Sequence, residues 1–214
     1  MRMKTNFLFF LAVVMLLASC QKEVNFQDEQ TSGGGGGTGN NNKSIIGDWI
    51  FAGMVGDTKS TVVFTDMGIQ LKGVTTSLYY TKNNKGTVKI TSSQFLFTGV
   101  GYDIDTTMHV KTYIDNVLLD DSDMPLVAST PPTDTKYDYV KNNADSLTLA
   151  GTVMSVSDPF SGGGPSGPSG GKISWSSDTL LITVKSHINT PISQGGTTGL
   201  LTGDLIGILK LKKK

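Results

Sequence analysis

The sequence predicts an all-β fold of antiparallel strands joined by short turns. Runs rich in Val, Ile, Thr, Phe and Tyr recur along residues 44–214, and Asp, Asn and Gly separate them. Helix start signals followed by helical periodicity do not occur in this region. Such a pattern is typical of an up-and-down β-barrel or of a β-sandwich, and strand periodicity alone does not choose between the two.

The first half of this region alternates between strand patterns and turn residues. In residues 108–114, Met108, Val110, Thr112 and Ile114 alternate with His109, Lys111 and Tyr113, which is the period of a strand with one buried face. Turns are expected where Gly, Asn or Asp accumulate, at residues 66–68, 83–86 and 115–116. Strands are expected between them, at residues 45–54, 59–65, 69–80, 87–91, 94–105, 108–114 and 117–119.

The second half of the region is interrupted by proline and glycine. Residues 120–136 contain Pro125, Pro131 and Pro132 and are expected to form a long irregular loop. Residues 161–171 combine glycines with two prolines and are expected to form a second long loop. Shorter strands are expected at residues 137–140, 146–150, 152–156, 172–175, 179–185 and 205–212, with a hairpin turn at residues 176–178.

The N-terminal residues have the composition of an export signal. Arg2 and Lys4 precede an apolar run over residues 7–17, which is too short to cross a hydrocarbon core of about 30 Å as a helix. The run ends in Leu-Ala-Ser followed by Cys20, and this ending resembles the lipobox of bacterial lipoproteins. The resemblance implies cleavage before Cys20, lipid on its thiol, and attachment of the protein to a membrane.

Three parts of the chain are therefore expected. They are a signal peptide at residues 1–19, a lipidated linker at residues 20–43 and one folded domain at residues 44–214. The linker is rich in Gly and Asn, so it is expected to stay flexible, with a reach of about 25–30 Å. Lys22 and Glu23 resemble in part the surface-export signal of lipoproteins in the Bacteroidetes. We therefore expect an outer-membrane protein displayed on the surface, with a periplasm-facing position as the alternative.

Charge and composition argue against several function classes. Loss of Arg2 and Lys4 with the signal leaves 16 of the 18 basic residues against 18 acidic residues. A nucleic-acid partner is not expected, because phosphate binding needs a clustered basic excess. The sequence has 2 histidines and neither a Gly-x-Ser-x-Gly nor a His-Glu-x-x-His motif, so we expect no enzyme and no cofactor. His109 is expected at the surface, and His187 in a loop at a strand end.

The start of the first strand carries a family resemblance. Gly47-Asp48-Trp49 resembles the Gly-x-Trp signature of lipocalins, in which the tryptophan plugs the closed end of a barrel. Residues 139, 145–149, 173–175 and 178–182 look like stretches of lipocalin-like domains in Bacteroidetes lipoproteins. The resemblance implies an antiparallel, up-and-down, lipocalin-like barrel that holds a small apolar ligand. Trp49 as an ordinary core residue stays the alternative.

One element of the lipocalin pattern is absent from the sequence. In that family an arginine from a late strand covers the tryptophan, and Arg2 is the only arginine of this chain. Lys210 or Lys212 is expected to supply a weaker cation–π contact to Trp49 instead.

A candidate ligand site is predicted on one face of the strands at residues 94–105 and 108–114. Its members are Val100, Tyr102, Ile104, Met108, Val110 and Ile114. A barrel interior is filled by side chains or holds one small ligand, and both interpretations are open here. The working function is non-catalytic binding of a small apolar molecule. The alternative is an interaction or structural module that contacts protein or glycan through residues 120–136 and 161–171.

One acidic segment is a weak candidate for calcium. Calcium prefers several carboxylate and carbonyl oxygens at close range. The segment offers Asp115, Asp120, Asp121 and Asp123. Their spacing lacks the regularity of an EF-hand, so an acidic segment without a metal is the favoured interpretation.

Overall fold

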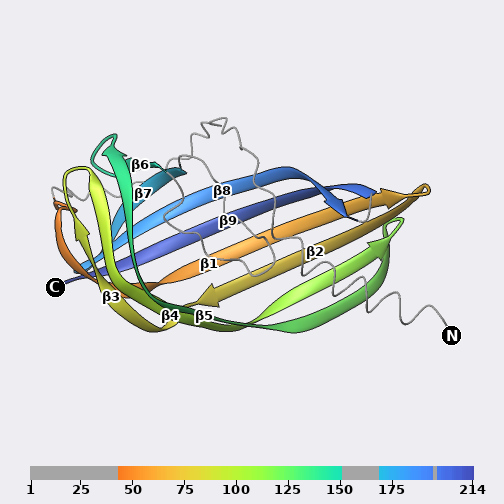
Figure 1. Cartoon of the computed structure of the whole chain (residues 1–214), viewed down its shortest axis with the longest axis horizontal. Coiled ribbons are helices and arrows are strands. Elements are labelled where there is room, and N and C mark those ends of the chain that lie inside the picture. The colour runs from red at the N-terminus through yellow and green to blue at the C-terminus, as the bar shows by residue number, and fades with distance from the viewer. Residues whose placement is uncertain (1–42, 151–168, 195–196) are drawn as a thin grey trace.

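The computed structural model describes residues 43–150, 169–194 and 197–214, which form nine strands (Figure 1). They are β1 (Gly47–Asp66), β2 (Ile69–Tyr80), β3 (Lys82–Ile90), β4 (Gln94–Ile114), β5 (Val117–Lys141), β6 (Ser146–Ala150), β7 (Ser169–Ser176), β8 (Thr179–Gln194) and β9 (Thr197–Lys213). These residues contain no helix, and hence none that could cross a membrane. The expected signal peptide, most of the linker, the strand at 152–156 and residues 161–168 of the loop expected at 161–171 lie outside the described residues. Residues 169–171 of that expected loop belong to β7, so the loop prediction is wrong for them.

The strands form one antiparallel sheet with a ring-like arrangement, so the all-β prediction is confirmed. β2 and β3 share the place between β1 and β4, because β3 pairs with the first residues of β1 and β2 pairs with the rest. From β4 each strand pairs with the next along the chain as far as β9. β9 then pairs with β1, from Lys213 opposite Trp49 to Gly199 opposite Phe64.

The ring of pairings is complete only at one end of the sheet. β6 pairs with the last residues of β5, and β7 pairs with the first residues of β8. Beyond these pairs, residues 117–137 of β5 and 185–194 of β8 have one strand neighbour each among the described residues. We call the end at β3, β6 and β7 the ring end. The opposite end, at the β1–β2 and β4–β5 turns, is called the open end (Figure 1).

The hydrophobic core fills the ring end. Alternate residues of each strand point inward there, as expected for a sheet with one buried face. Aromatic rings supply much of the contact, with Phe95 4.8 Å from Tyr139 and Trp49 5.8 Å from Trp175 between ring centroids. The buried apolar side chains of this cluster are Ile45, Trp49, Phe51, Met54, Tyr79, Val88, Ile90, Phe95, Phe97, Tyr102, Ile104, Met108, Leu126, Tyr139, Leu147, Leu149, Ile173, Leu180, Ile182, Val184, Leu209 and Leu211.

The prediction of a long loop at residues 120–136 is wrong, because these residues form the middle of β5. Proline has no N–H and cannot donate to a neighbouring strand, so it is tolerated where one edge of a strand is unpaired. β5 has such an edge over residues 117–137 among the described residues. Pro131 and Pro132 also coincide with a register shift against β4, between Val100 and Tyr102.

Several other strands are longer than the sequence predicts. β1 and β4 each join two predicted strands, and residues 83–86 form an irregular part of β3 rather than a turn. The predicted turns at residues 66–68 and 115–116 are confirmed, with positive φ at Met67, Gly68, Asp115 and Asn116. Positive φ at both central residues matches the twist of the flanking strands in a two-residue hairpin.

Two inward-facing glycines on paired strands should differ in how much stability they lose on replacement by alanine. A Cβ at Gly56 would overlap the buried Tyr79 ring, whereas a Cβ at Gly73 would meet nothing within 4 Å. We expect Gly56→Ala to lower the free energy of unfolding by about 1–3 kcal/mol, as overpacking does. Gly73→Ala, the matched control, should change it by less than about 0.5 kcal/mol. Urea denaturation measures both, and equal losses would contradict the packing described for Tyr79.

Candidate functional site

The residues predicted to bind a ligand do not form one lining. Tyr102, Ile104 and Met108 are buried on the inner face of β4 and belong to the ring-end core. Val100 and Val110 are partly buried and pack against that core. The sixth member, Ile114, lies at the β4–β5 turn with 38% of its surface exposed. The structure therefore brings together five of the six and assigns most of them to packing.

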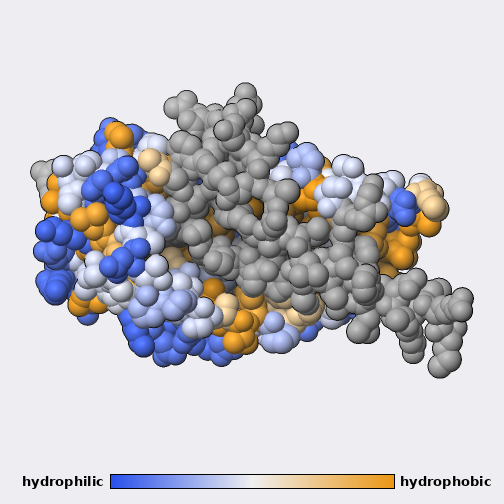
Figure 2. Space-filling view, in the orientation of Figure 1, coloured by the Kyte–Doolittle hydropathy of each residue, from blue (hydrophilic) through white to orange (hydrophobic). Residues whose placement is uncertain are grey.

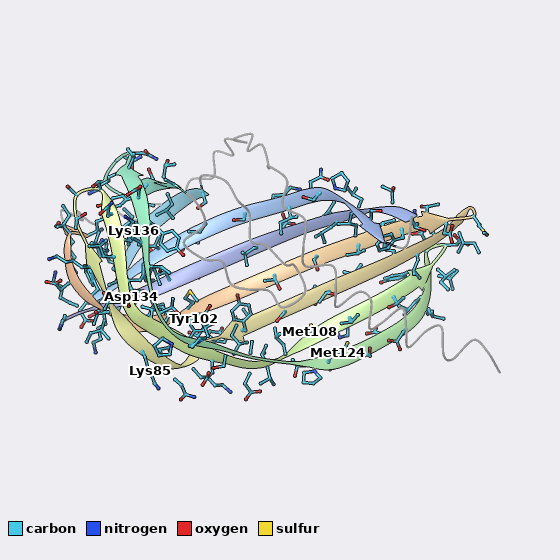
Figure 3. All side chains as sticks on the ribbon, viewed as in Figure 1. Lys85, Tyr102, Met108, Met124, Asp134 and Lys136 are labelled. Atoms are coloured by element: carbon cyan, nitrogen blue, oxygen red, sulfur yellow. The ribbon has the colours of Figure 1, made fainter. Side chains whose placement is uncertain are left out.

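A second candidate site is found by following the inward residues from one strand to the next in register. Residues paired in register on neighbouring strands share a face of the sheet, because side chains alternate with a period of two. One such set crosses six strands, and we call it the serine row. Its members are Met124 on β5, Met108 on β4, Ser77 on β2, Thr58 on β1, Leu205 on β9 and Ser186 on β8. Figure 3 shows Met108 and Met124 beside each other.

The row next to the serine row on the ring-end side is densely packed. It contains Tyr79 on β2, Gly56 on β1, Gly207 on β9 and Val184 on β8. The Tyr79 ring occupies the space that a side chain at Gly56 would need. Nearer the ring end, the centroids of the Phe51 and Tyr102 rings lie 6.1 Å apart. These side chains form a floor beneath the serine row.

Two rows on the open-end side of the serine row mix glycine, serine and threonine with a few aliphatic side chains. The first contains Ser122, Val110, Thr75, Ser60, Gly203 and Ile188. The second contains Asp120, Thr112, Gly73, Val62, Leu201 and Thr190. Most of these residues are only half-buried, and the position of Gly73 has open space around it. The inner face thus changes from a solid core to a small-residue lining.

Two hydroxyls of the serine row have no hydrogen-bond partner. Ser77 and Ser186 are 8% and 5% exposed, and their Oγ atoms are unpaired. A buried polar atom without a partner costs free energy and is rare in folded proteins. The sequence carried a signal for Ser186, which falls in alternation with Ile182, Val184 and Ile188. A polar residue at an inward position of an apolar strand was the feature that sequence reasoning missed.

At the ring end, the buried Trp49 is covered by Lys213. Trp49 is 1% exposed, and its Nε1 donates to the Ile45 carbonyl at 2.9 Å. Lys213 places its Nζ 4.6 Å from the Trp49 ring centroid. The expectation that Lys210 or Lys212 would fill this role is wrong, since Lys210 lies over Tyr80 at 5.7 Å and Lys213 opposes Trp49 in register.

Two features of the structure favour glycine at position 47, two residues before Trp49. Gly47 has a φ of 144°, which side chains rarely adopt. A Cβ there would also come within 2.6 Å of Lys213 Nζ. The Gly-x-Trp element therefore leaves room for the lysine that covers the tryptophan.

The four aspartates suggested for calcium do not gather at one point, because they contact different partners. Asp121 and Asp123 flank His109 on the outer face, each with one oxygen 2.8 Å from a different ring nitrogen. Asp115 instead accepts the Gln70 N–H at 2.9 Å, and Asp120 accepts the Ser122 hydroxyl at 2.8 Å. The described part of the chain contains no group of three or more His, Cys, Asp or Glu side chains arranged to hold a metal.

Both histidines lie on the outer face of the sheet. His109 borders an open groove of about 390 Å³ together with Asp57, Thr76 and Asp123. His187 lies within β8 rather than in the expected loop, with Nδ1 2.8 Å from Asp204 on β9. Comparison of the chain with protein-family models, with curated proteins and with solved structures finds no match.

The contact between Lys213 and Trp49 can be tested with a matched pair of variants. Lys213→Met keeps the aliphatic stem and removes the charge over the ring, so we expect a loss of about 0.5–1 kcal/mol in the free energy of unfolding. Lys212→Met changes a neighbouring exposed lysine and should have no measurable effect. The urea midpoints of both variants measure this difference. Indistinguishable midpoints would show that the contact between Lys213 and Trp49 does not contribute to the free energy of unfolding.

Proposed function

We propose that this protein is a lipid-anchored binding protein of the cell envelope. In this proposal its sheet is a lipocalin-like barrel that holds a small, largely apolar molecule without converting it. The attachment is supported by the sequence before the folded region, where an apolar run ends in Leu-Ala-Ser-Cys20. The barrel is supported by the return of the strand pairings to β1 and by the Gly47–Trp49–Lys213 arrangement.

The entry of the linker supports one orientation of the domain. Lys43, the last linker residue, donates to the Ser177 carbonyl at 3.0 Å and lies 5.4 Å from the Trp175 ring centroid. The linker therefore joins the domain at the ring end. With lipid on Cys20, the composition of residues 20–43 predicts a flexible linker with an r.m.s. reach of about 25–30 Å between the membrane and the ring end. The open end is then the end of the domain farther from the attached linker, where a ligand can enter.

The main support for a binding function is the change in the size and polarity of the inward side chains along the inner face. A protein stabilised by packing alone has no need of glycine, serine and threonine at inward positions, since buried apolar area supplies most of the stability. Here such residues line the rows beyond the serine row, and Gly73 faces open space. Binding sites for small molecules are mostly apolar concavities with a few placed polar groups.

Native mass spectrometry tests the proposal on the whole exported chain carrying Cys20→Ser, purified from the periplasm without detergent. We expect a discrete added mass that disappears on denaturation, because a bound ligand is held by non-covalent contacts. The same protein is then denatured, refolded and incubated with dodecan-1-ol as a control for reloading. A bare mass in both samples would contradict a carrier function.

A bare mass would instead favour an interaction module, for which the open end offers a second observation. Apolar side chains are exposed at the β1–β2 and β4–β5 turns, and Figure 2 shows apolar surface at this end. They are Met67, Ile69, Ile114, Val117, Leu118 and Leu119. The two turns are adjacent, because Asp115 and Gln70 exchange two hydrogen bonds of 2.9 Å. Exposed apolar groups gathered in this way are typical of a contact surface for another molecule.

A further inference from the structure

The two unpaired hydroxyls lie at the boundary between the packed core and the small-residue lining. Ser77 and Ser186 stand on β2 and β8, with β1 and β9 between them. Three strand spacings of about 4.8 Å separate them by about 14 Å along the curved sheet. Each serine hydroxyl can donate one hydrogen bond and accept others. Buried hydroxyls with unused bonding capacity at the base of a lined space are suited to a polar group of a ligand.

The charge of the lining restricts which polar group fits. The register places no Lys or His on the serine row or on the two rows beyond it. Lys213 covers Trp49 beneath the floor, and the lysines of β1 and β8 lie on the outer face. Asp120 is the one charged side chain of these rows, and it is exposed on the edge strand. A carboxylate or phosphate buried here would lack a cationic partner, which is costly.

We propose that the serine row selects an uncharged amphiphile, a long apolar molecule that ends in a hydroxyl or carbonyl oxygen. This inference rests on the proposed binding function and specifies its ligand class. The polar end lies on Ser77 or Ser186, in the row that also contains Met108 and Met124, and the apolar body extends past Val110 toward the open end. Anionic fatty acids and cationic amines of the same length bind more weakly, since both lose their hydration without gaining an opposite charge.

Three probes of equal chain length separate these possibilities at neutral pH. They are dodecan-1-ol, dodecanoate and dodecylammonium, titrated by calorimetry into the whole exported chain carrying Cys20→Ser. We expect the alcohol to bind at least tenfold more tightly than either ion. The double variant Ser77→Ala, Ser186→Ala should weaken alcohol binding by about two- to tenfold, the range that one hydrogen bond supplies. Dodecanoate binding should not change.

Ser174→Ala is the matched control, since Ser174 is half-buried on the outer face of β7, next in the chain to the inward-facing Ile173, and lies outside the serine row and the two rows beyond it. It should leave the alcohol affinity within twofold of that of the unchanged protein. Equal affinities for the three probes, or an equal loss in Ser174→Ala and in the double variant, would overturn the serine row as the selecting element while leaving the binding function standing. Failure of all three probes to bind would overturn both.

Stability without ligand gives a second, independent readout. Removing a buried hydroxyl that has no partner removes its desolvation cost, so Ser77→Ala and Ser186→Ala should each raise the urea midpoint of the ligand-free protein. A serine that served the fold would give the opposite sign. A lowered midpoint in both variants would therefore overturn the proposal, even if the alcohol bound. The expected combination is higher stability together with weaker alcohol binding.

Discussion

The pairing of the first strand with the last is the constraint on which the rest of the structure depends. β1 and β9 run side by side from Trp49 and Lys213 at the ring end to Phe64 and Gly199 at the open end. This pairing covers the edges that both strands would otherwise expose, and exposed edges promote aggregation. It also brings together residues far apart in the chain, so loop-closure entropy must be overcome before the ring forms.

The inner face changes in character from the ring end to the open end of the sheet. Aromatic and aliphatic side chains at the ring end bury the apolar area that offsets the conformational entropy of folding. Tyr79 marks the boundary, because its ring fills the space above Gly56. Beyond it the same alternation of side chains presents mainly Ser, Thr and Gly, with Val62, Val110, Ile188 and Leu201 between them. One strand pattern thus yields a solid half and a lined half, according to the size of the inward residues.

Local sequence patterns predicted most of the strands. The period of two in residues 108–114 places Met108 and Val110 inward and His109 outward, as the structure has them. β2 and β6 have the bounds that were expected from their turns. The strand at residues 120–136 could not be predicted from its own sequence. Its prolines are tolerated because one edge of β5 has no strand neighbour there among the described residues. Edge position is a property of the sheet and is not visible in the segment itself.

The site was harder to predict than the strands, for reasons of register. A bulge in β1 between Phe51 and Gly53 changes which residues face inward, so Phe51 and Met54 are both buried. The alternation of Leu209, Leu211 and Lys213 nevertheless carried a signal that the last of these faces Trp49. The serine row spans six strands, and its members become neighbours only when every pairing is known.

The central claim is that the space beyond Tyr79 receives an apolar molecule. Methionine methyl groups report this directly, because Met108 and Met124 lie on the serine row, Met54 lies in the core and Met67 lies at an exposed turn. The measurement is the carbon-13 methyl spectrum of methionine-labelled protein during titration with dodecan-1-ol. Shifts at Met108 and Met124, with Met54 and Met67 unchanged, are the predicted result. Shifts confined to Met67, or none at all, would contradict binding on the inner face.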